Sequence, residues 1–183
     1  THNPQAIIVT GSTSGLGRCV AFGCARAGAR GVLITGRDTE RGKAAVAAVR
    51  EAAPDCKCGF VAASLDDGAE AARAVVESAV ALFGQVDGLV NSAAACFPRG
   101  DLESTSPELW DHMMATNLTA PFHLTQLVAR HLKAKKLRGS IVNVGSSAAH
   151  GGFPLILAYS VSKAGRVAGR KSTARPDIRS WTR

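Results

Sequence analysis

A tyrosine and a lysine stand four residues apart in the segment YSVSK, at Tyr159 and Lys163. If this segment is helical, both side chains lie on one face. A phenol titrates near ~10 in water, so it exchanges protons at neutral pH only when a nearby cation stabilises its anion. Such a pair is also common as a plain surface contact. Ser146 raises the case for catalysis, because it follows an apolar, strand-like run and its hydroxyl can donate to a substrate carbonyl.

A glycine-rich run, TGSTSGLG, extends from Thr10 to Gly17. Gly11 permits a tight turn, Gly15 lets the backbone approach phosphates, and Gly17 allows close packing of a helix on a strand. The N-terminus of the following helix offers free N–H groups and a partial positive charge to a pyrophosphate. A strand precedes the run and a second strand–helix unit follows it, so the run predicts a dinucleotide site rather than a plain turn.

The end of the second strand favours NADP(H) over NAD(H), which stays open as the alternative. An acidic residue there would bind the ribose hydroxyls of NAD, whereas an arginine suits the 2′-phosphate of NADP. The position is occupied by Gly36 and Arg37, and Arg18 follows the last glycine of the run. Both arginines could instead be solvated surface charges.

Short apolar runs alternate with stretches of helical spacing along most of the chain. This pattern predicts an α/β fold, a doubly wound parallel sheet of Rossmann type with its ligand crevice at the carboxyl ends of the strands. The expected strands are 5–10, 31–35, 58–63, 86–91 and 140–145, and the expected helices are 15–29, 39–53, 67–83 and 106–136.

These motifs together resemble the short-chain dehydrogenase/reductase family, in its TGxxxGxG and YxxxK subgroup, over about residues 5–163. LVNSAA, which contains Asn91, stands where the family has an NNAG-like segment, and Asn117 in ATNLTAPFHLTQ matches its catalytic-helix asparagine. IVNVGSS and YSVSK match its serine and tyrosine–lysine elements. The resemblance implies the strand order 3-2-1-4-5 and a homodimer or tetramer that pairs through the helices of Asn117 and Tyr159.

The resemblance also implies a role for each catalytic residue. Tyr159 is expected to be the general acid/base, and Ser146 to orient and polarise the substrate C=O. Lys163 is expected to favour the anionic tyrosine and to bind the nicotinamide ribose. Asn117 is expected to hold a water that relays protons from Lys163 to solvent.

Cofactor contacts are implied for the glycine run, the ends of the next three strands and the catalytic helix. They are Thr10, Gly11, Ser12, Ser14, Gly15, Leu16, Gly17, Arg37, Ser64, Leu65, Asn91, Ala93, Tyr159 and Lys163. Two positions depart from the family pattern. Ser64 stands where the family has an aspartate for the adenine, and Ala94 replaces the glycine of the NNAG-like segment.

The chain departs most from the family after Lys163, where it reads AGRVAGRKSTARPDIRSWTR. The family continues with a long apolar-faced helix and two further strands. Arg166 and Arg170 occupy positions that should be apolar, and burying them without partners would be costly. We therefore expect the helix after Lys163 to be displaced or frayed and the C-terminal strands to be missing. Dimerisation through that helix is then in doubt. Residues 1–163 then form the dinucleotide-binding and catalytic domain, and 164–183 a basic, divergent tail of it. A truncation, a misread frame and a genuine short isoform all remain open.

The composition indicates which kinds of partner and surroundings the protein has. The net charge is +8, but residues 164–183 carry +5 of it, so the body of the chain is nearly balanced and nucleic acid is disfavoured as a partner. Five cysteines without a CxxC pair indicate a reduced, cytoplasmic protein, and the histidines show no metal-ligand spacing. The sequence contains no run of eighteen apolar residues and therefore predicts no membrane-spanning helix.

Two functional hypotheses follow. The first is an NADP(H)-dependent oxidoreductase that interconverts a small-molecule carbonyl and an alcohol by hydride transfer. The alternative is a truncated, non-catalytic remnant of such an enzyme, which binds the nucleotide without transferring hydride.

Overall fold

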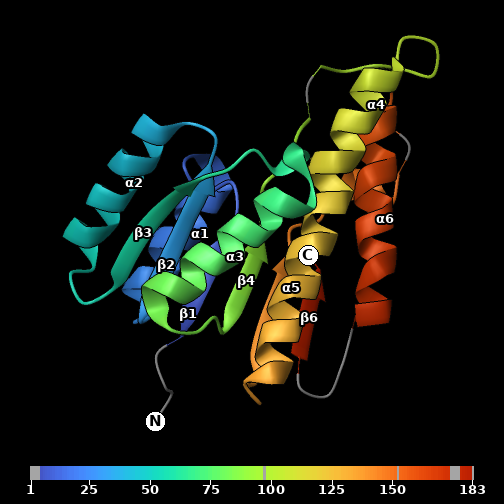
Figure 1. The fold of residues 1–183 in the computed structure, drawn as a ribbon. Coiled ribbons are helices and arrows are strands. Elements are labelled where there is room, and N and C mark those ends of the chain that lie inside the picture. Colours follow the sequence, from blue (N-terminus) through green and yellow to red (C-terminus); the bar gives the residue numbers. More distant parts are fainter. Residues whose placement is uncertain (1–4, 97, 152, 174–177, 183) are drawn as a thin grey trace.

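A single parallel sheet with helices on both faces forms the centre of the molecule (Figure 1). The computed structural model describes residues 5–96, 98–151, 153–173 and 178–182, and only the backbone from residue 170 onward. The sheet of these residues has six strands in the order β3-β2-β1-β4-β5-β6. The predicted doubly wound order 3-2-1-4-5 is therefore confirmed.

The elements follow the predicted alternation of strand and helix. The strands are β1 Ala6–Val9, β2 Gly31–Gly36, β3 Lys57–Ala62, β4 Gly88–Asn91, β5 Gly139–Asn143 and β6 Ile178–Thr182. The α-helices are α1 Gly15–Arg26, α2 Thr39–Ala52, α3 Ala69–Phe83, α4 Pro107–Met114, α5 Ala120–Ala134 and α6 Leu157–Thr173. Three short turns complete the set: the 3-10 turns η1 Leu65–Asp67 and η3 Ser147–Ala149, and the π-helical turn η2 Ala115–Thr119.

Two apolar clusters hold the helices against the sheet. One joins the inner faces of α3 and α5 to strand residues such as Ile8 and Leu89, which are fully buried. The other joins α1 and α2 to Val9, Val32 and Ile34 on the opposite face. Strands covered on both faces explain why β1 and β2 read as near-continuous apolar runs rather than as alternating ones.

The predicted helix over 106–136 is confirmed, with one irregular turn inside it. Ser106 caps its start by accepting a hydrogen bond from the N–H of Leu109 at 3.2 Å. In the middle, α4 passes through the π-helical turn η2 into α5. Pro121 lies just beyond this turn and has no N–H, so it cannot be the α-helical donor to the carbonyl of Asn117.

The C-terminal segment corrects the sequence analysis. Helix α6 continues past Lys163 to Thr173, and β6 pairs in parallel with β5, from Ile178 beside Gly139 to Thr182 beside Asn143. The expected fraying was wrong, and so was the expected absence of a sixth strand, whereas the described residues contain no seventh strand. Arg166 is buried, but it has a partner, because its Nη1 donates to the carbonyl of Val144 at 3.0 Å. The side chain of Arg170 lies outside the described residues.

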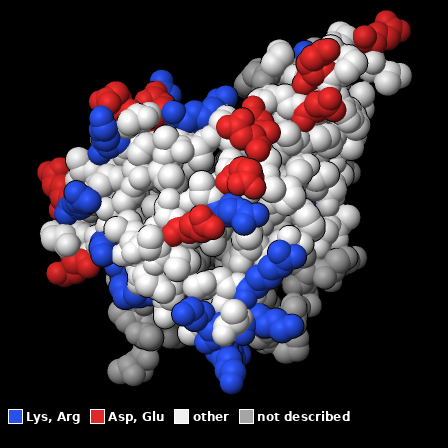
Figure 2. All heavy atoms as spheres, in the orientation of Figure 1, with Lys and Arg blue, Asp and Glu red and all other residues white. Residues whose placement is uncertain are grey.

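Charge is distributed unevenly over the surface. Basic side chains gather at the end of α5, at the amino ends of the strands, where Lys133, Lys135, Lys136 and Arg138 are exposed (Figure 2). Cations there complement the C-terminal end of the helix dipole. No helix in the described part of the chain has the length and apolarity needed to cross a bilayer.

Candidate functional site

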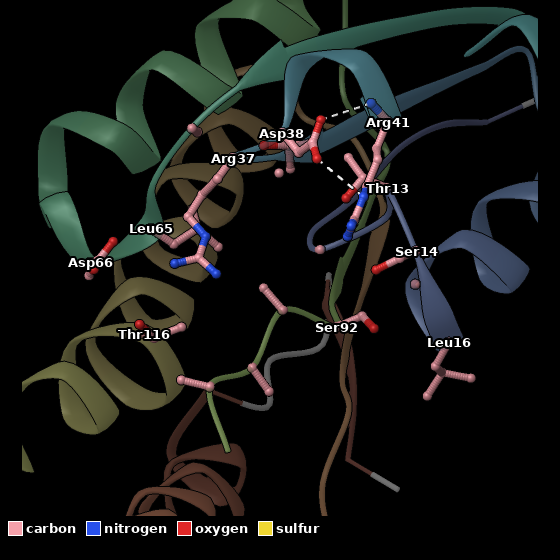
Figure 3. A pocket seen from close by; sticks show the side chains of 18 of the residues that line it. Thr13, Ser14, Leu16, Arg37, Asp38, Arg41, Leu65, Asp66, Ser92 and Thr116 are labelled. Carbon is pink, nitrogen blue, oxygen red and sulfur yellow. Dashed lines mark hydrogen bonds and ion pairs between the residues drawn. The ribbon is translucent and has the colours of Figure 1, made fainter. Parts of the chain in front are cut away.

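A cleft of about 360 Å³ opens at the carboxyl ends of β1 to β4 (Figure 3). Its walls come from the glycine turn after β1, the ends of β2 and β3, the loop after β4 and one face of α4 and η2. This is the edge of a doubly wound sheet where the strand order reverses between β1 and β4, and ligands of such sheets bind there.

The glycine turn has no room for side chains at two positions. A Cβ on Gly11 would lie 2.7 Å from the Cα of Ala93, and one on Gly17 would press against the carbonyl oxygen of Gly11. Gly11 and Gly15 also have φ of +61° and +52°, a region that favours glycine. The turn therefore brings bare backbone to the floor of the cleft and leads into the N-terminus of α1.

Several predicted cofactor residues line the cleft: Gly11, Ser14, Leu16, Gly17, Arg37, Leu65 and Ala93. Others are buried in supporting contacts. The hydroxyl of Ser12 donates to the carbonyl of Val9 and accepts from the N–H of Thr35, at 2.6 and 3.1 Å. Asn91 donates to the side chain of Asn143 at 2.9 Å and so ties β4 to β5.

Thr10 connects the glycine turn to the loop after β4. Its hydroxyl oxygen accepts the backbone N–H groups of Ser92 and Ala93, both at 3.0 Å. Thr10 is almost completely buried, so it shapes the cleft from behind.

The two candidate arginines lie in different places. Arg37 lines the cleft and points into it (Figure 3), whereas the exposed Arg18 lies over the ring of Phe22 on α1, 5.5 Å from its centroid. Asp38 caps α2 by accepting from the N–H of Arg41 and also pairs with the Arg41 guanidinium at 3.1 Å. Within the described residues Arg37 has no ion pair, and its charge is available to a ligand.

An aspartate and a histidine meet across the mouth of the cleft. The carboxylate of Asp66, after β3, lies 3.2 Å from Nδ1 of His112 on α4, and both residues line the cleft. The hydroxyl of Ser64 donates to the same carboxylate and is the main cause that lowers the pKa of Asp66. Position 64, where the family has an aspartate, thus holds a serine that is hydrogen-bonded to a carboxylate two residues on.

The tyrosine–lysine pair lies on α6 as predicted. The ammonium Nζ of Lys163 is 5.6 Å from the centroid of the Tyr159 ring and donates to the carbonyl of Val144 at 3.1 Å. Lys163 is only 1% exposed. Burial, and then the neighbouring charge of Arg166, lower its pKa to about 8, whereas Cys96 acts in the opposite direction.

Asn117 joins the loop after β4 to the tyrosine helix. Its side chain accepts from the N–H of Ala95 and donates to the carbonyl of the same residue, both at 2.8 Å. It also donates to Ser162 Oγ at 3.1 Å, and that hydroxyl donates to the carbonyl of Tyr159 at 2.7 Å. The amide of Asn117 therefore uses both of its N–H groups inside the protein.

Ser146 begins the turn η3 after β5, and its hydroxyl accepts from the N–H of Ala148 at 3.2 Å. Because η3 packs against α6, Ser146 and Tyr159 belong to touching elements at the same edge of the sheet. Neither of these residues, nor Lys163, lines the cleft that Arg37 enters. The candidate site thus has two parts, the cleft that Arg37 enters and the tyrosine–lysine pair, and the loop after β4 connects them.

Sequence reasoning missed Asp38, Arg41, Asp66 and His112, all of which line the cleft. Asp38 carried a readable signal, since an aspartate directly before a helical stretch is a typical N-cap. The contact between Asp66 and His112 joins residues far apart in the chain, and no local pattern indicates it.

Comparison with known proteins agrees with this geometry. The family model described as short chain dehydrogenase matches residues 5–177. An uncharacterized oxidoreductase of Thermotoga maritima is 36% identical over 170 residues, which cover 93% of this chain and 64% of that protein. The chain therefore belongs to the short-chain dehydrogenase/reductase family.

Two solved structures resemble the whole described fold. A metagenomic short-chain oxidoreductase in complex with NADP has a TM-score of 0.88 at 30% identity, over 97% of this chain and 79% of that one. Actinorhodin polyketide ketoreductase with NADPH has a TM-score of 0.87 at 30% identity, over 97% and 68%. The chain spans about two thirds of the length of the curated relatives it matches.

Proposed function

We propose that this protein is an NADP(H)-dependent oxidoreductase that interconverts a carbonyl and an alcohol, with Tyr159 as the general acid/base. The observation that carries the proposal is the buried ammonium of Lys163, 5.6 Å from the centroid of the Tyr159 ring. A buried cation beside a phenol favours the phenolate, which an acid/base tyrosine needs near neutral pH.

The residues of the cleft fit a nicotinamide dinucleotide. The glycine turn exposes backbone where any Cβ at position 11 or 17 would collide, and it leads into a helix N-terminus suited to a pyrophosphate. Arg37 would meet the 2′-phosphate of NADP, and its neighbour Asp38 is already engaged by Arg41. The solved structures that contain NADP and NADPH support the same choice.

When bound, the nicotinamide supplies or accepts the hydride. Tyr159 would donate a proton to the substrate oxygen as negative charge develops there, so that no free alkoxide forms. Ser146 would hold that oxygen by a hydrogen bond, since its hydroxyl donates to no other described residue. Lys163, whose pKa is about 8, would return the proton to Tyr159.

The test is NADPH oxidation with a panel of ketones, alongside NADPH binding measured by calorimetry. We expect turnover, and we expect Tyr159→Phe to lower kcat at least about a hundredfold, because general acid catalysis of this kind contributes that much. NADPH binding should persist in the variant. Equal turnover by the variant would remove the assignment of Tyr159.

A second candidate is a remnant that binds nucleotide without hydride transfer. It is favoured by the separation in this structure between the cleft and the tyrosine–lysine pair, which does not line it. The same experiment distinguishes the two: tight NADPH binding with no turnover on any substrate would establish the remnant.

Two further proposals follow for the protein's surroundings. The five cysteines are all unpaired, which supports a reducing compartment such as the cytoplasm. We also propose a homodimer through α5 and α6, because α6 is intact to Thr173 and both helices expose apolar residues, Phe122 and Val161.

A further inference from the structure

Two cations of α6 share one backbone oxygen. Lys163 Nζ and Arg166 Nη1 both donate to the carbonyl of Val144, at 3.1 and 3.0 Å. Val144 directly follows β5 and leads into the turn of Ser146. One carbonyl thus serves as the hydrogen-bond acceptor for two positive groups one helical turn apart.

Arg166 makes few hydrogen bonds for a buried arginine. It is only 5% exposed, and its Nε and Nη2 have no hydrogen-bond partner among the described residues. Burial lowers its pKa to about 10, so the guanidinium is still charged at neutral pH. A buried charge without a counter-ion destabilises the fold, and a packed apolar residue would fit position 166 at lower cost.

Among the described side chains, few titratable groups act on the ammonium of Lys163. Arg166 and Tyr159 face it from α6 itself, and Cys96 from the loop between β4 and α4. The turn η2 brings the neutral amide of Asn117 against α6, and β5 brings the Val144 carbonyl. On α4, Glu108 and Asp111 are exposed and His112 is paired with Asp66. Among the side chains that the structure describes, no carboxylate therefore offsets the two cations.

We propose that Arg166 is a positioning residue that acts as a second buried cation, setting the protonation state of Lys163 and hence the pH range in which the Tyr159–Lys163 pair works. The positive charge of Arg166 makes Lys163 release its proton more readily. Because Arg166 also donates to the Val144 carbonyl, that oxygen stabilises the Lys163 ammonium less. The effect of Arg166 on turnover rests on the proposed function. Its effect on Lys163 does not.

Three substitutions at this position separate charge from hydrogen bonding. Arg166→Met removes both, Arg166→Gln keeps a donor for the Val144 carbonyl without the charge, and Arg166→Lys keeps the charge. Arg130→Met, at an exposed position on α5, is the matched control. Met at position 166 removes an unpaired buried charge, so we expect the variant to fold; the Gln variant is a second neutral substitution if it does not.

The direct measurement is the pH titration of the Lys163 side chain by NMR, in protein with isotope-labelled lysine and with Lys163→Met to assign the signal. We expect the titration midpoint to rise by ~1 pH unit in the Met and Gln variants, the lower end of shifts caused by one nearby charge. It should stay near the wild-type value in Arg166→Lys and Arg130→Met. Midpoints in the Met and Gln variants equal to wild type would overturn the proposal.

Turnover gives the second measurement. If the protein reduces ketones with NADPH, the pH profile of kcat/KM should move in the same direction and by a similar amount in Arg166→Met and Arg166→Gln. A shift in Arg166→Met that Arg166→Gln does not share would assign the effect to the lost hydrogen bond and contradict a role for charge. If no variant turns over, the proposed function fails, and the NMR titration still decides the role of Arg166.

Discussion

Arg37 and Asp38 are neighbours in the chain and carry opposite charges at the rim of the cleft. An aspartate close to this position could bind ribose hydroxyls and favour NAD, whereas an arginine favours NADP. The two side chains make different contacts in this structure. Asp38 caps α2 and pairs with Arg41, while Arg37 points into the cleft.

We expect Arg37→Gln to weaken NADPH binding about tenfold or more, the size of one lost charge-assisted hydrogen bond. NADH, which has no 2′-phosphate, should bind the variant and the wild type alike. Dissociation constants from calorimetry check this. Arg18→Gln, on the surface of α1, is the control and should change neither affinity. A parallel loss for both nucleotides in Arg37→Gln would contradict the assignment.

At the scale of elements, a histidine fastens helix α5 to the segment before β4. Nε2 of His131 accepts the backbone N–H of Val86 at 3.2 Å, which requires the neutral imidazole. Burial first, and then the charge of Lys135, lower the pKa of His131, although Asp87 opposes them. The strand that leads to Asn91 thus depends on an uncharged histidine.

The pH dependence of stability follows from that pKa. Because His131 titrates below its usual 6.5 in the folded chain, the unfolded chain binds more protons in that range. The free energy of unfolding should therefore fall as the pH drops from about 7 to 5, within the histidine range. Urea unfolding of His131→Gln should show a smaller slope against pH, while the exposed control His150→Gln keeps the wild-type slope. Equal slopes in all three proteins would contradict this role.

The elements were largely predictable from the sequence, because the strands are short apolar runs and caps or glycines mark the ends of several helices, as Asp38, Gly84 and Ser106 do for α2, α3 and α4. The prediction failed after Lys163, where Arg166 was taken as incompatible with a packed helix. The carbonyl of Val144, which accepts its hydrogen bond, comes from another element and is invisible in the local pattern. The contact of Asp66 with His112 was missed for the same reason.

At the scale of the molecule, α5 and α6 expose apolar side chains that no other described part of the chain covers. Phe122 is 57% exposed and Val161 40%. Between the helices lies a groove of about 110 Å³ lined by Leu118, Phe122 and Gly165 among others. Large exposed apolar side chains beside a groove are typical of an interaction surface, and the proposed homodimer would use this one.

We expect Phe122→Asp to convert a dimer into a monomer, because two copies of the new carboxylate would have to be buried without partners at a symmetric interface. Sedimentation velocity at matched concentrations checks the change in mass. Phe153→Asp is the control, since Phe153 is 49% exposed but lies in the loop before α6. A wild-type protein that sediments as a monomer would rule out the dimer.

The buried side chain of Thr10 has a consequence for how the binding of nucleotide and the binding of substrate affect each other. Through Thr10 the glycine turn holds Ser92 and Ala93. Two residues after Ala93, Ala95 is held by Asn117, and Asn117 reaches Tyr159 through Ser162. If a nucleotide at the turn tightens this chain and thereby raises the affinity for a carbonyl substrate at Tyr159, thermodynamics requires the reverse. The substrate must then raise the affinity for the nucleotide by the same factor.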